Sequence, residues 1–407
     1  MSKEPHLSIL RLVDLLLSLA DAFDIIPRFF KLPRDYDEFK KDVERNPNRL
    51  YIQKPTNSSR GRGVKMILRP KDVPRDTKDV LIQHYVDRPL LINRLKFDLR
   101  IYICATCMDP LRLYVYTDGL ARFATEEYSE DKSDLKNRCV HLTNVSVNKK
   151  SSKFVANEST EEESSGSKWS LRALRSYFDA QDSAQGKTGS SSWSLIWKQV
   201  HDISVKSVLA AECRMNVENK VKVPHRYNCF EVFGIDVMLD SDLRAWLIEV
   251  NTCPSLASDC PLDSRVKGSM ISDCMNMVGV VPFDLEALKA EVEARKQARL
   301  TGLPTGREAP QQHQVAMPKT VKEAEEMDFT SISQDRLPDI IIEMEAEYER
   351  RRGWERAFPC VEDPLKYLDL FETPRTSNTM ACLYLASKKG SKKPGTSGTG
   401  RHHWRVQ

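Results

Sequence analysis

A basic, glycine-containing loop is the first segment whose residue types could do chemistry. In QKPTNSSRGRGV, residues 53–64, Lys54 ends a β-like run, and Gly61 and Gly63 stand just before the next one. Glycines let a loop backbone approach phosphate oxygens closely, while Lys54 and Arg62 supply positive charge. The segment matches neither the P-loop nor the dinucleotide-binding fingerprint, because no helix follows the glycines. It is therefore a candidate phosphate-binding loop, with an ordinary basic hairpin loop as the alternative.

A second segment predicts two carboxylates that face each other in a β-hairpin. The run CFEVFGIDVMLD is followed by SDLR and then by AWLIEVN. If the turn centres on Asp242 and Leu243, antiparallel pairing places Asp236 opposite Glu249, with Asn251 on the same face. Like charges in directly opposite positions are destabilising, whereas oxygen ligands of this kind suit a hard divalent cation. We therefore predict a metal site at Asp236, Glu249 and Asn251, in preference to an exposed hairpin face with incidental acids.

Two further motifs carry polar residues on strand-like or irregular segments. In KFDLR, Lys96, Asp98 and Arg100 alternate along one face of a predicted strand, and Arg122 follows in GLARFAT. The segment HLTNVSVN, residues 141–148, has too many hydrogen-bonding groups for a core strand. Each motif is weak alone, and their order along one chain is the informative feature.

Composition limits the classes of protein to be considered. The chain has 407 residues, 40% of them hydrophobic, and its 62 basic and 58 acidic residues leave a net charge of +4. A nucleic-acid partner is not expected from so small a charge. The apolar stretch Leu7–Ala20 contains Arg11 and Asp14 and is too short to span a membrane, so we expect an amphipathic helix there rather than a signal peptide. Ten scattered cysteines favour free thiols in a reducing compartment, and hence a cytoplasmic protein.

Short strand-like runs alternate with loops and a few helices from Tyr51 to about Met238, and these elements must position the motifs. Taken together, the motifs resemble the tubulin–tyrosine-ligase-like family of ATP-grasp ligases, and most closely its glutamylating branch. The likeness runs from about Phe29 to Pro282 through KP…RGRGV, QHYV, KFDLRIY, GLARFAT, HLTNVSVNKK, FEVFGIDVMLD and WLIEVNTCPSLASDCPLD.

The resemblance implies an α+β ATP-grasp fold, in which two α+β lobes sandwich ATP. Less sequence than usual precedes KLPRDYDEF, so we expect a shortened N-terminal domain. The expected parts are a partial N-terminal region, a central lobe, a C-terminal lobe, a helical extension and a basic disordered tail, at residues 1–50, 51–87, 88–282, 283–375 and 376–407.

Roles for single residues also follow from the resemblance. Lys54, Arg62 and Gly63 would hold the phosphates of ATP, and Gln83 to Val86 would form the adenine hinge. The residues implied in nucleotide binding are Lys54, Arg62, Gly63, Gln83, His84, Tyr85, Val86, Lys96, Phe97, Asp98, Thr143 and Asn144. Magnesium would be bound by Asp236, Glu249 and Asn251, with Arg100 and Glu249 as catalytic residues. Free glutamate would be held by Arg122, Ser146, Lys168 and Lys267.

The implied activity is an ATP- and Mg²⁺-dependent ligation of free L-glutamate to side-chain carboxylates in the acidic tails of tubulin, through an acyl phosphate. A glycylase of the same family is one alternative, although glycine has no side-chain carboxylate to pair with a cationic pocket. A non-catalytic microtubule-binding module is the other. We expect a monomer that binds microtubules, without nucleic-acid or membrane partners, in the cytoplasm and cytoskeleton, with the ciliary basal body or axoneme as an alternative. The basic half of the predicted helix 283–300 could contact the acidic microtubule surface.

Overall fold

The structure is a computed structural model that describes residues 23–56, 58, 61–131, 133–157, 163–223, 229–279, part of 286–297, and 337–390. The predicted helix at residues 7–20, most of the basic helix 283–300 and the last part of the tail lie outside the described residues. No helix in the described part of the chain is long and apolar enough to cross a membrane.

The smaller lobe is a four-stranded antiparallel sheet with the strand order β1-β4-β2-β3. Its strands are β1 (Phe29–Leu32), β2 (Tyr51–Pro55), β3 (Lys65–Ile67) and β4 (Val80–His84), and helix α2 (Tyr36–Arg45) packs against them. Buried Asp42 on α2 bonds to the Tyr51 hydroxyl and to Nε2 of His84, each at 2.7 Å, and so fixes the helix to two strands. The expected boundary at residue 50/51 cuts through this lobe, because β1 pairs with β4 and belongs to the same sheet.

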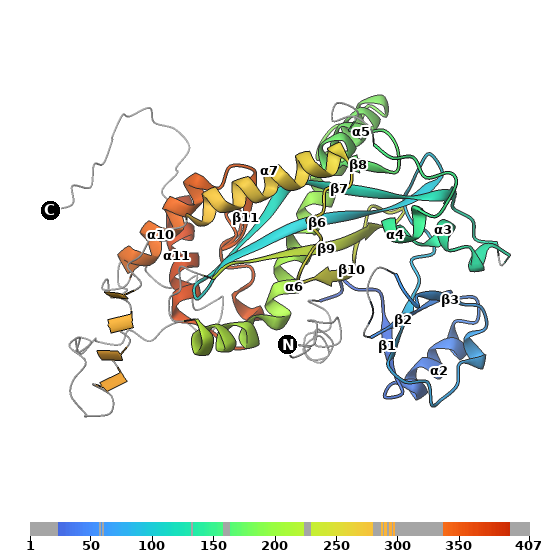
Figure 1. The fold of residues 1–407 in the computed structure, drawn as a ribbon, viewed down its shortest axis with the longest axis horizontal. Coiled ribbons are helices and arrows are strands. Elements are labelled where there is room, and N and C mark those ends of the chain that lie inside the picture. Colours follow the sequence, from blue (N-terminus) through green and yellow to red (C-terminus); the bar gives the residue numbers. More distant parts are fainter. Residues whose placement is uncertain are drawn as a thin grey trace.

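The larger lobe is built on a seven-stranded antiparallel sheet with the order β10-β9-β6-β7-β11, to which β5 and β8 add at β6 and β7. Its strands are β5 (Leu91–Ile92), β6 (Leu95–Met108), β7 (Leu111–Glu127), β8 (Lys168–Ser170), β9 (Glu231–Leu239), β10 (Ala245–Asn251) and β11 (Trp354–Phe358). Helices α5 (Leu171–Ala184) and α6 (Ser192–Lys222) share a hydrophobic core with one face of the sheet, and α7 (Pro261–Val278) shares a second core with the other face. These elements are labelled in Figure 1. The expected α+β class is confirmed.

Alternation along β6 decides what each face of the large sheet carries. Leu99, Ile101 and Ile103 are fully buried in the core on the α5 and α6 side. Tyr102 and Cys104 point to the opposite face, into a second core with residues of α7. Because side chains alternate along a strand, Lys96, Asp98 and Arg100 share the α7 side of the sheet with Tyr102. On this face of the sheet, the apolar surface that packs against α7 is followed by charged side chains toward the N-terminal end of β6.

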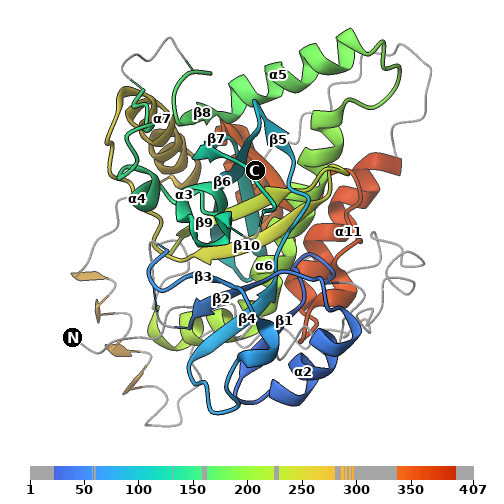
Figure 2. The same ribbon diagram turned by 90° about the vertical axis from the view of Figure 1, so that its right-hand side faces the viewer.

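Two short helices, α3 (Arg138–His141) and α4 (Val145–Asn148), join the lobes. They lie between the small lobe and the end of the large sheet in Figure 1, and Figure 2 shows α3 above β3 in the turned view. A small hydrophobic cluster combines Ile52 and Tyr85 with Leu142 and Val147 from this segment. Buried Asn148 fixes α4 to β7, because its Oδ1 accepts from the amide and the hydroxyl of Thr125 at 2.9 Å.

The C-terminal part corrects the expected organisation. Helix α11 (Thr376–Gly390) occupies the first half of the segment expected to be a disordered tail. Its Met380, Cys382 and Leu383 are buried in the main core. The prediction of a disordered tail rested on the basic residues from Lys388 onward, which follow these apolar residues in the sequence. The expected helical extension also contains strand β11, which pairs with β7. With α10 (Leu337–Arg350), these elements complete the larger lobe rather than trail behind it.

We expect that a chain ending at residue 375 cannot fold, whereas a chain ending at Gly390 keeps every contact described here. Burial of each large apolar side chain contributes roughly 1.5–3 kcal/mol, and α11 buries Met380, Leu383 and Leu385. The combined contribution of these three side chains approaches the net stability of a typical domain, about 5–15 kcal/mol. Soluble yield and the unfolding transition of the two chains provide the measurement, and equal stability would mean that α11 is dispensable.

Candidate active site

Strand register collects most of the predicted charged residues on one face of the large sheet. Glu249 on β10 lies opposite Asp236 on β9, which lies opposite Arg100 on β6. Two residues earlier on β6, Asp98 lies opposite Arg122 on β7, which in turn lies opposite Lys168 on β8. Residues directly opposite each other, or two apart on one strand, share a face. We call these six residues the charged row: Lys168, Arg122, Asp98, Arg100, Asp236 and Glu249.

The predicted pairing of Asp236 with Glu249 is confirmed, but a bulge is required to produce it. Near the turn the register is Ala245 to Leu239 and Leu247 to Val237, which by itself would place Ile248 opposite Asp236. A register shift between Leu247 and Glu249 advances β10 by one residue. β-Bulges of this kind re-aim side chains beside functional sites.

A buried network of ion pairs occupies the middle of the charged row. Arg100 donates to both carboxylate oxygens of Asp236, at 2.6 and 3.2 Å. Arg122 donates to both oxygens of Asp98, at 2.8 and 2.5 Å, and its Nη2 also lies 2.8 Å from Asp236. Burial opposes ionisation of Asp236, yet the two guanidinium groups overcome it and lower the pKa of this carboxyl to about 2. Arg122, predicted to hold glutamate, therefore faces two carboxylates of its own chain.

Glu249 is the carboxylate of the charged row that has no hydrogen bond or ion pair among the described residues. Burial and the neighbouring charge of Asp236 raise its pKa. Asn251 uses its side-chain amide nitrogen on the Gly234 carbonyl at 3.2 Å, which leaves its side-chain oxygen for another partner. No group of three His, Cys, Asp or Glu side chains in the described residues could hold a metal ion. Two carboxylates and an amide oxygen nevertheless form a donor set that fits a hard cation.

Two lysines, the buried Lys96 and the half-buried Lys54, face the same region from different lobes. Lys54 at the end of β2 donates to Oε1 of Gln83 at 2.7 Å, and Lys96 on β6 donates to the Tyr85 hydroxyl at 2.7 Å. Burial lowers the pKa of Lys54 to about 8, although Glu249 and Asp236 favour its charged form. Burial also lowers the pKa of Lys96 to about 7, against the influence of Asp98. An anion placed between these lysines would restore their charge.

The predicted adenine hinge is assembled, but most of its polar groups already have partners. The amide nitrogen of the buried Gln83 side chain donates to the Pro27 carbonyl at 3.0 Å, and the Tyr85 amide donates to the Leu50 carbonyl at 3.0 Å. His84 contacts Asp42 and Arg49 within the small lobe, on the side of α2. The Val86 amide has no hydrogen-bond partner in the described chain and is the available donor.

The loop predicted to bind phosphate meets the second lobe at Gly61. Gly61 and Gly63 have φ of +69° and +72°, which favour glycine. A Cβ on Gly61 would lie 2.8 Å from Oδ1 of Asn144, and a Cβ on Gly63 would lie 2.6 Å from Cγ of Pro55. Arg138 on α3, which the sequence analysis missed, donates to the Gly61 carbonyl at 2.5 Å. The loop carrying Arg62 thus lies against Asn144.

The two lobes contribute unequally to the site. The small lobe brings Lys54 and the glycine loop, and the large sheet brings the charged row. The short helices α3 and α4 make part of the contact between the lobes, where Arg138 reaches Gly61 and His141 reaches Tyr85. A helix of four residues has little stability of its own. The position of α3 must therefore come from these contacts and from Asn148, which fixes the next turn to β7.

Of the remaining predicted residues, the structure brings some together and separates others. Lys168 and Lys267 both contact the buried carboxylate of Asp263, at 2.5 and 3.3 Å. Asp263 was not predicted, and its only local signal is an acidic residue in the first turn of α7. Thr143 is buried beside α4, which carries Ser146. The Phe97 ring instead packs on Phe123 in the core, at 5.4 Å between centroids, away from the charged row.

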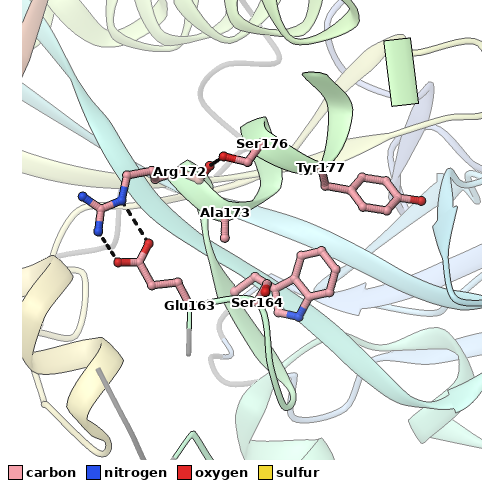
Figure 3. Close-up of a pocket in the computed structure, with 7 residues that line it drawn as sticks. Glu163, Ser164, Arg172, Ala173, Ser176 and Tyr177 are labelled. Carbon is pink, nitrogen blue, oxygen red and sulfur yellow. Dashed lines mark hydrogen bonds and ion pairs between the residues drawn. The ribbon is translucent and has the colours of Figure 1, made fainter. Parts of the chain in front are cut away.

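A pocket of about 570 Å³ lies elsewhere, where Trp169 of β8 meets α5 (Figure 3). Trp169 follows Lys168 and so points to the other face of the sheet. Glu163 and Arg172, which line this pocket, form an ion pair with each other (Figure 3). The pocket therefore adds no net charge, and the chemistry predicted from the sequence lies in the charged row.

Comparison with known proteins gives consistent relatives. The chain is 34% identical over 389 residues to the tubulin polyglutamylase TTLL5 of Mus musculus, covering 91% of this chain and 28% of that protein. It is 36% identical over 386 residues to the tubulin monoglutamylase TTLL4 of Homo sapiens, covering 92% and 31%. The tubulin polyglutamylase ttll-4 of Caenorhabditis elegans is 38% identical over 268 residues, covering 65% and 42%.

The chain therefore spans between about a quarter and a half of the length of these relatives. Residues 6–288 match the model of the tubulin-tyrosine ligase family, which is more than half of the chain and includes every residue of the charged row. This chain belongs to the tubulin-tyrosine ligase family.

Proposed function

We propose that the protein is an ATP-dependent ligase that joins free glutamate to side-chain carboxylates of glutamates in tubulin tails. The charged row carries this proposal, because it places a cation-binding donor set, two arginines and a lysine on one face of a rigid sheet. The names of the relatives, which are tubulin polyglutamylases and a monoglutamylase, support the choice of amino acid and acceptor.

Nucleotide binding is assigned to the side of the charged row that faces the small lobe. Lys54 and Lys96 would pair with phosphate oxygens, and the glycines of the loop would let its backbone approach them. The Val86 amide would meet the adenine, and Thr143 and Asn144 would close the pocket from the second lobe. The acceptor carboxylate would take the terminal phosphoryl group of ATP, with release of ADP, and the amine of glutamate would then displace inorganic phosphate from the acyl phosphate and lose a proton as the amide bond forms.

Magnesium is assigned to Asp236, Glu249 and Asn251, and when bound it neutralises phosphate charge. Glu249 is the principal ligand in this proposal, since its carboxylate makes no hydrogen bond or ion pair among the described residues, and the nearby cations leave its pKa raised. Asp236 is held in its ionised form by Arg100 and Arg122, ready to accept a cation. Arg100, adjacent to this pair, is placed to stabilise negative charge that develops on the transferred phosphoryl group.

The amino-acid site is assigned to Arg122, Ser146, Lys168 and Lys267. With every group ionised, the site as a whole combines six basic side chains with four carboxylates and has a surplus of two positive charges: Lys54, Lys96, Arg100, Arg122, Lys168 and Lys267, against Asp98, Asp236, Glu249 and Asp263. A surplus of this sign favours polyanionic ligands, including an amino acid with two carboxylates. It argues against a glycylase, because glycine brings one carboxylate fewer.

Tubulin is the proposed partner and the cytoskeleton the proposed location. One assay tests the proposal: the purified chain, microtubules, ATP, Mg²⁺ and either labelled glutamate or labelled glycine, with the modified residues mapped by mass spectrometry. Incorporation of glutamate is expected. Incorporation of glycine alone would identify a glycylase, and microtubule binding without any incorporation would identify a non-catalytic module.

Replacement of Glu249 by Gln should reduce ligation by at least about a hundredfold, because it removes charge from the metal site with little change in volume. The folded state should remain intact, and unfolding in the absence of metal should require a slightly higher temperature, since burial raises the pKa of Glu249 and its charge opposes folding at neutral pH. Turnover and thermal unfolding are measured side by side. Glu231→Gln, on the same hairpin but outside the charged row, is the control.

Nucleotide affinity should fall as pH rises through the pKa values of Lys96 and Lys54. In the free protein, burial lowers the pKa of Lys54 to about 8 and that of Lys96 to about 7, so both lose their protons above these values. A bound polyphosphate raises both pKa values, and binding therefore takes up protons. The Kd for a non-hydrolysable ATP analogue should increase at least about tenfold from pH 7 to pH 9. Calorimetry in buffers with different ionisation heats measures both effects, and an affinity independent of pH would remove the lysines from the site.

Replacement of Arg122 by Lys should raise the KM for glutamate more than the KM for ATP, because a guanidinium that pairs with Asp98 and Asp236 has a further nitrogen to offer a substrate carboxylate, whereas a lysine has a single nitrogen for all of these partners. Lysine keeps the positive charge between Asp98 and Asp236, so the protein should still fold. Steady-state kinetics with each substrate varied in turn give the comparison. Equal increases in both KM values would place Arg122 in the support of Asp236 instead.

A further inference from the structure

A chain of hydrogen bonds runs from a predicted nucleotide ligand to a residue with no assigned role. The Lys96 ammonium donates to the Tyr85 hydroxyl at 2.7 Å. The same hydroxyl lies 2.9 Å from Nδ1 of His141, and Nε2 of His141 lies 3.2 Å from the Asp134 carbonyl. These groups come from β6, the hinge after β4, helix α3 and the turn before α3, so four separate segments meet here.

The donor and acceptor properties of these groups allow only one direction of donation along the series of hydrogen bonds. A carbonyl oxygen can only accept, so Nε2 of His141 must carry the proton that reaches Asp134. Neutral histidine then has an unprotonated Nδ1, which accepts the Tyr85 hydroxyl proton. The Tyr85 oxygen is left to accept from Lys96. Every donor in the series therefore has one acceptor, and the histidine is held as its neutral Nε2–H tautomer.

The surroundings isolate this series of hydrogen bonds from water. Lys96 is 1% exposed, His141 is 3% exposed and Tyr85 is 7% exposed. The Lys96 ammonium also lies 4.1 Å from the centroid of the Tyr85 ring, and the rings of Tyr85 and Tyr128 both contact His141 edge-on. Burial and the charge of Lys96 lower the pKa of His141, which agrees with its neutral form.

We propose that His141 is a positioning residue that acts through Tyr85 to fix the Lys96 ammonium toward the nucleotide phosphates. A lysine side chain has several rotatable bonds, and ordering it costs conformational entropy, which the hydrogen bond to the Tyr85 oxygen offsets before the nucleotide arrives. This inference rests on the proposed function, since it takes Lys96 as a phosphate ligand. It gives the histidine of HLTNVSVN a role in the affinity for the nucleotide.

Four variants test the proposal in the full chain. Tyr85→Phe keeps the ring and removes the oxygen, and His141→Phe removes both ring nitrogens. His141→Asn keeps an acceptor near the position of Nδ1. His201→Phe is the matched control, because His201 lies on α6 and pairs with Glu355, far along the chain from the hinge. The Kd of a non-hydrolysable ATP analogue, the KM values for ATP and glutamate, and thermal unfolding are measured for each.

Tyr85→Phe and His141→Phe should each raise the Kd and the KM for ATP about tenfold, with the KM for glutamate changed less than about twofold. His141→Asn should recover most of the loss, and His201→Phe should behave as the parent. In the double variant Tyr85→Phe/His141→Phe the losses should not add, because the two residues act in series.

Additive losses, equal effects on both substrates, or no rescue by asparagine in a folded protein would overturn the proposal, because a merely structural histidine would give these results. A parent chain that binds no nucleotide would instead refute the proposed function, and the two failures are therefore distinguishable.

Discussion

The pairing of charges across strands β9, β6 and β7 is the constraint on which the rest of the site depends. Asp98, Arg122, Asp236 and Arg100 are all nearly buried, and buried charges are tolerated only when they are paired and hydrogen-bonded. Removing one member would leave an uncompensated charge inside the protein. The network therefore fixes the register of three strands, and with it the position of Glu249 on the fourth.

This network also limits what its members can do. Asp236 is ionised and well oriented because two guanidinium groups pair with it directly. The carboxylate of Glu249 nearby has no such pair, and burial and the charge of Asp236 outweigh the influence of the nearby cations on its pKa. A cation bound to both would relieve the repulsion between them. For Lys54 and Lys96 the situation is reversed, since desolvation of their ammonium groups disfavours the charged form until an anion binds. In the proposed assignment, the free protein therefore holds an incomplete cation site and an incomplete anion site close to each other.

The sequence alone determined the features that depend on local periodicity. A strand repeats every two residues and a hairpin pairs across its turn. These two rules suffice to place Lys96, Asp98 and Arg100 on one face, and Asp236 opposite Glu249. The bulge after Leu247 was not predicted. The observed turn is centred half a residue away from the expected position, and the bulge restores the pairing of Asp236 with Glu249. The order of the family motifs supplied the α+β class.

Tertiary structure alone decided the contacts that join distant segments. Asp263 between Lys168 and Lys267, Asp98 beside Arg122, and His141 behind Tyr85 arise from sheet order and helix packing, which no local pattern encodes. Helix α11 is a similar case, since its apolar residues acquire meaning only against the core that they cover. Local rules set which way a side chain points, and the packing of separate elements decides what it meets.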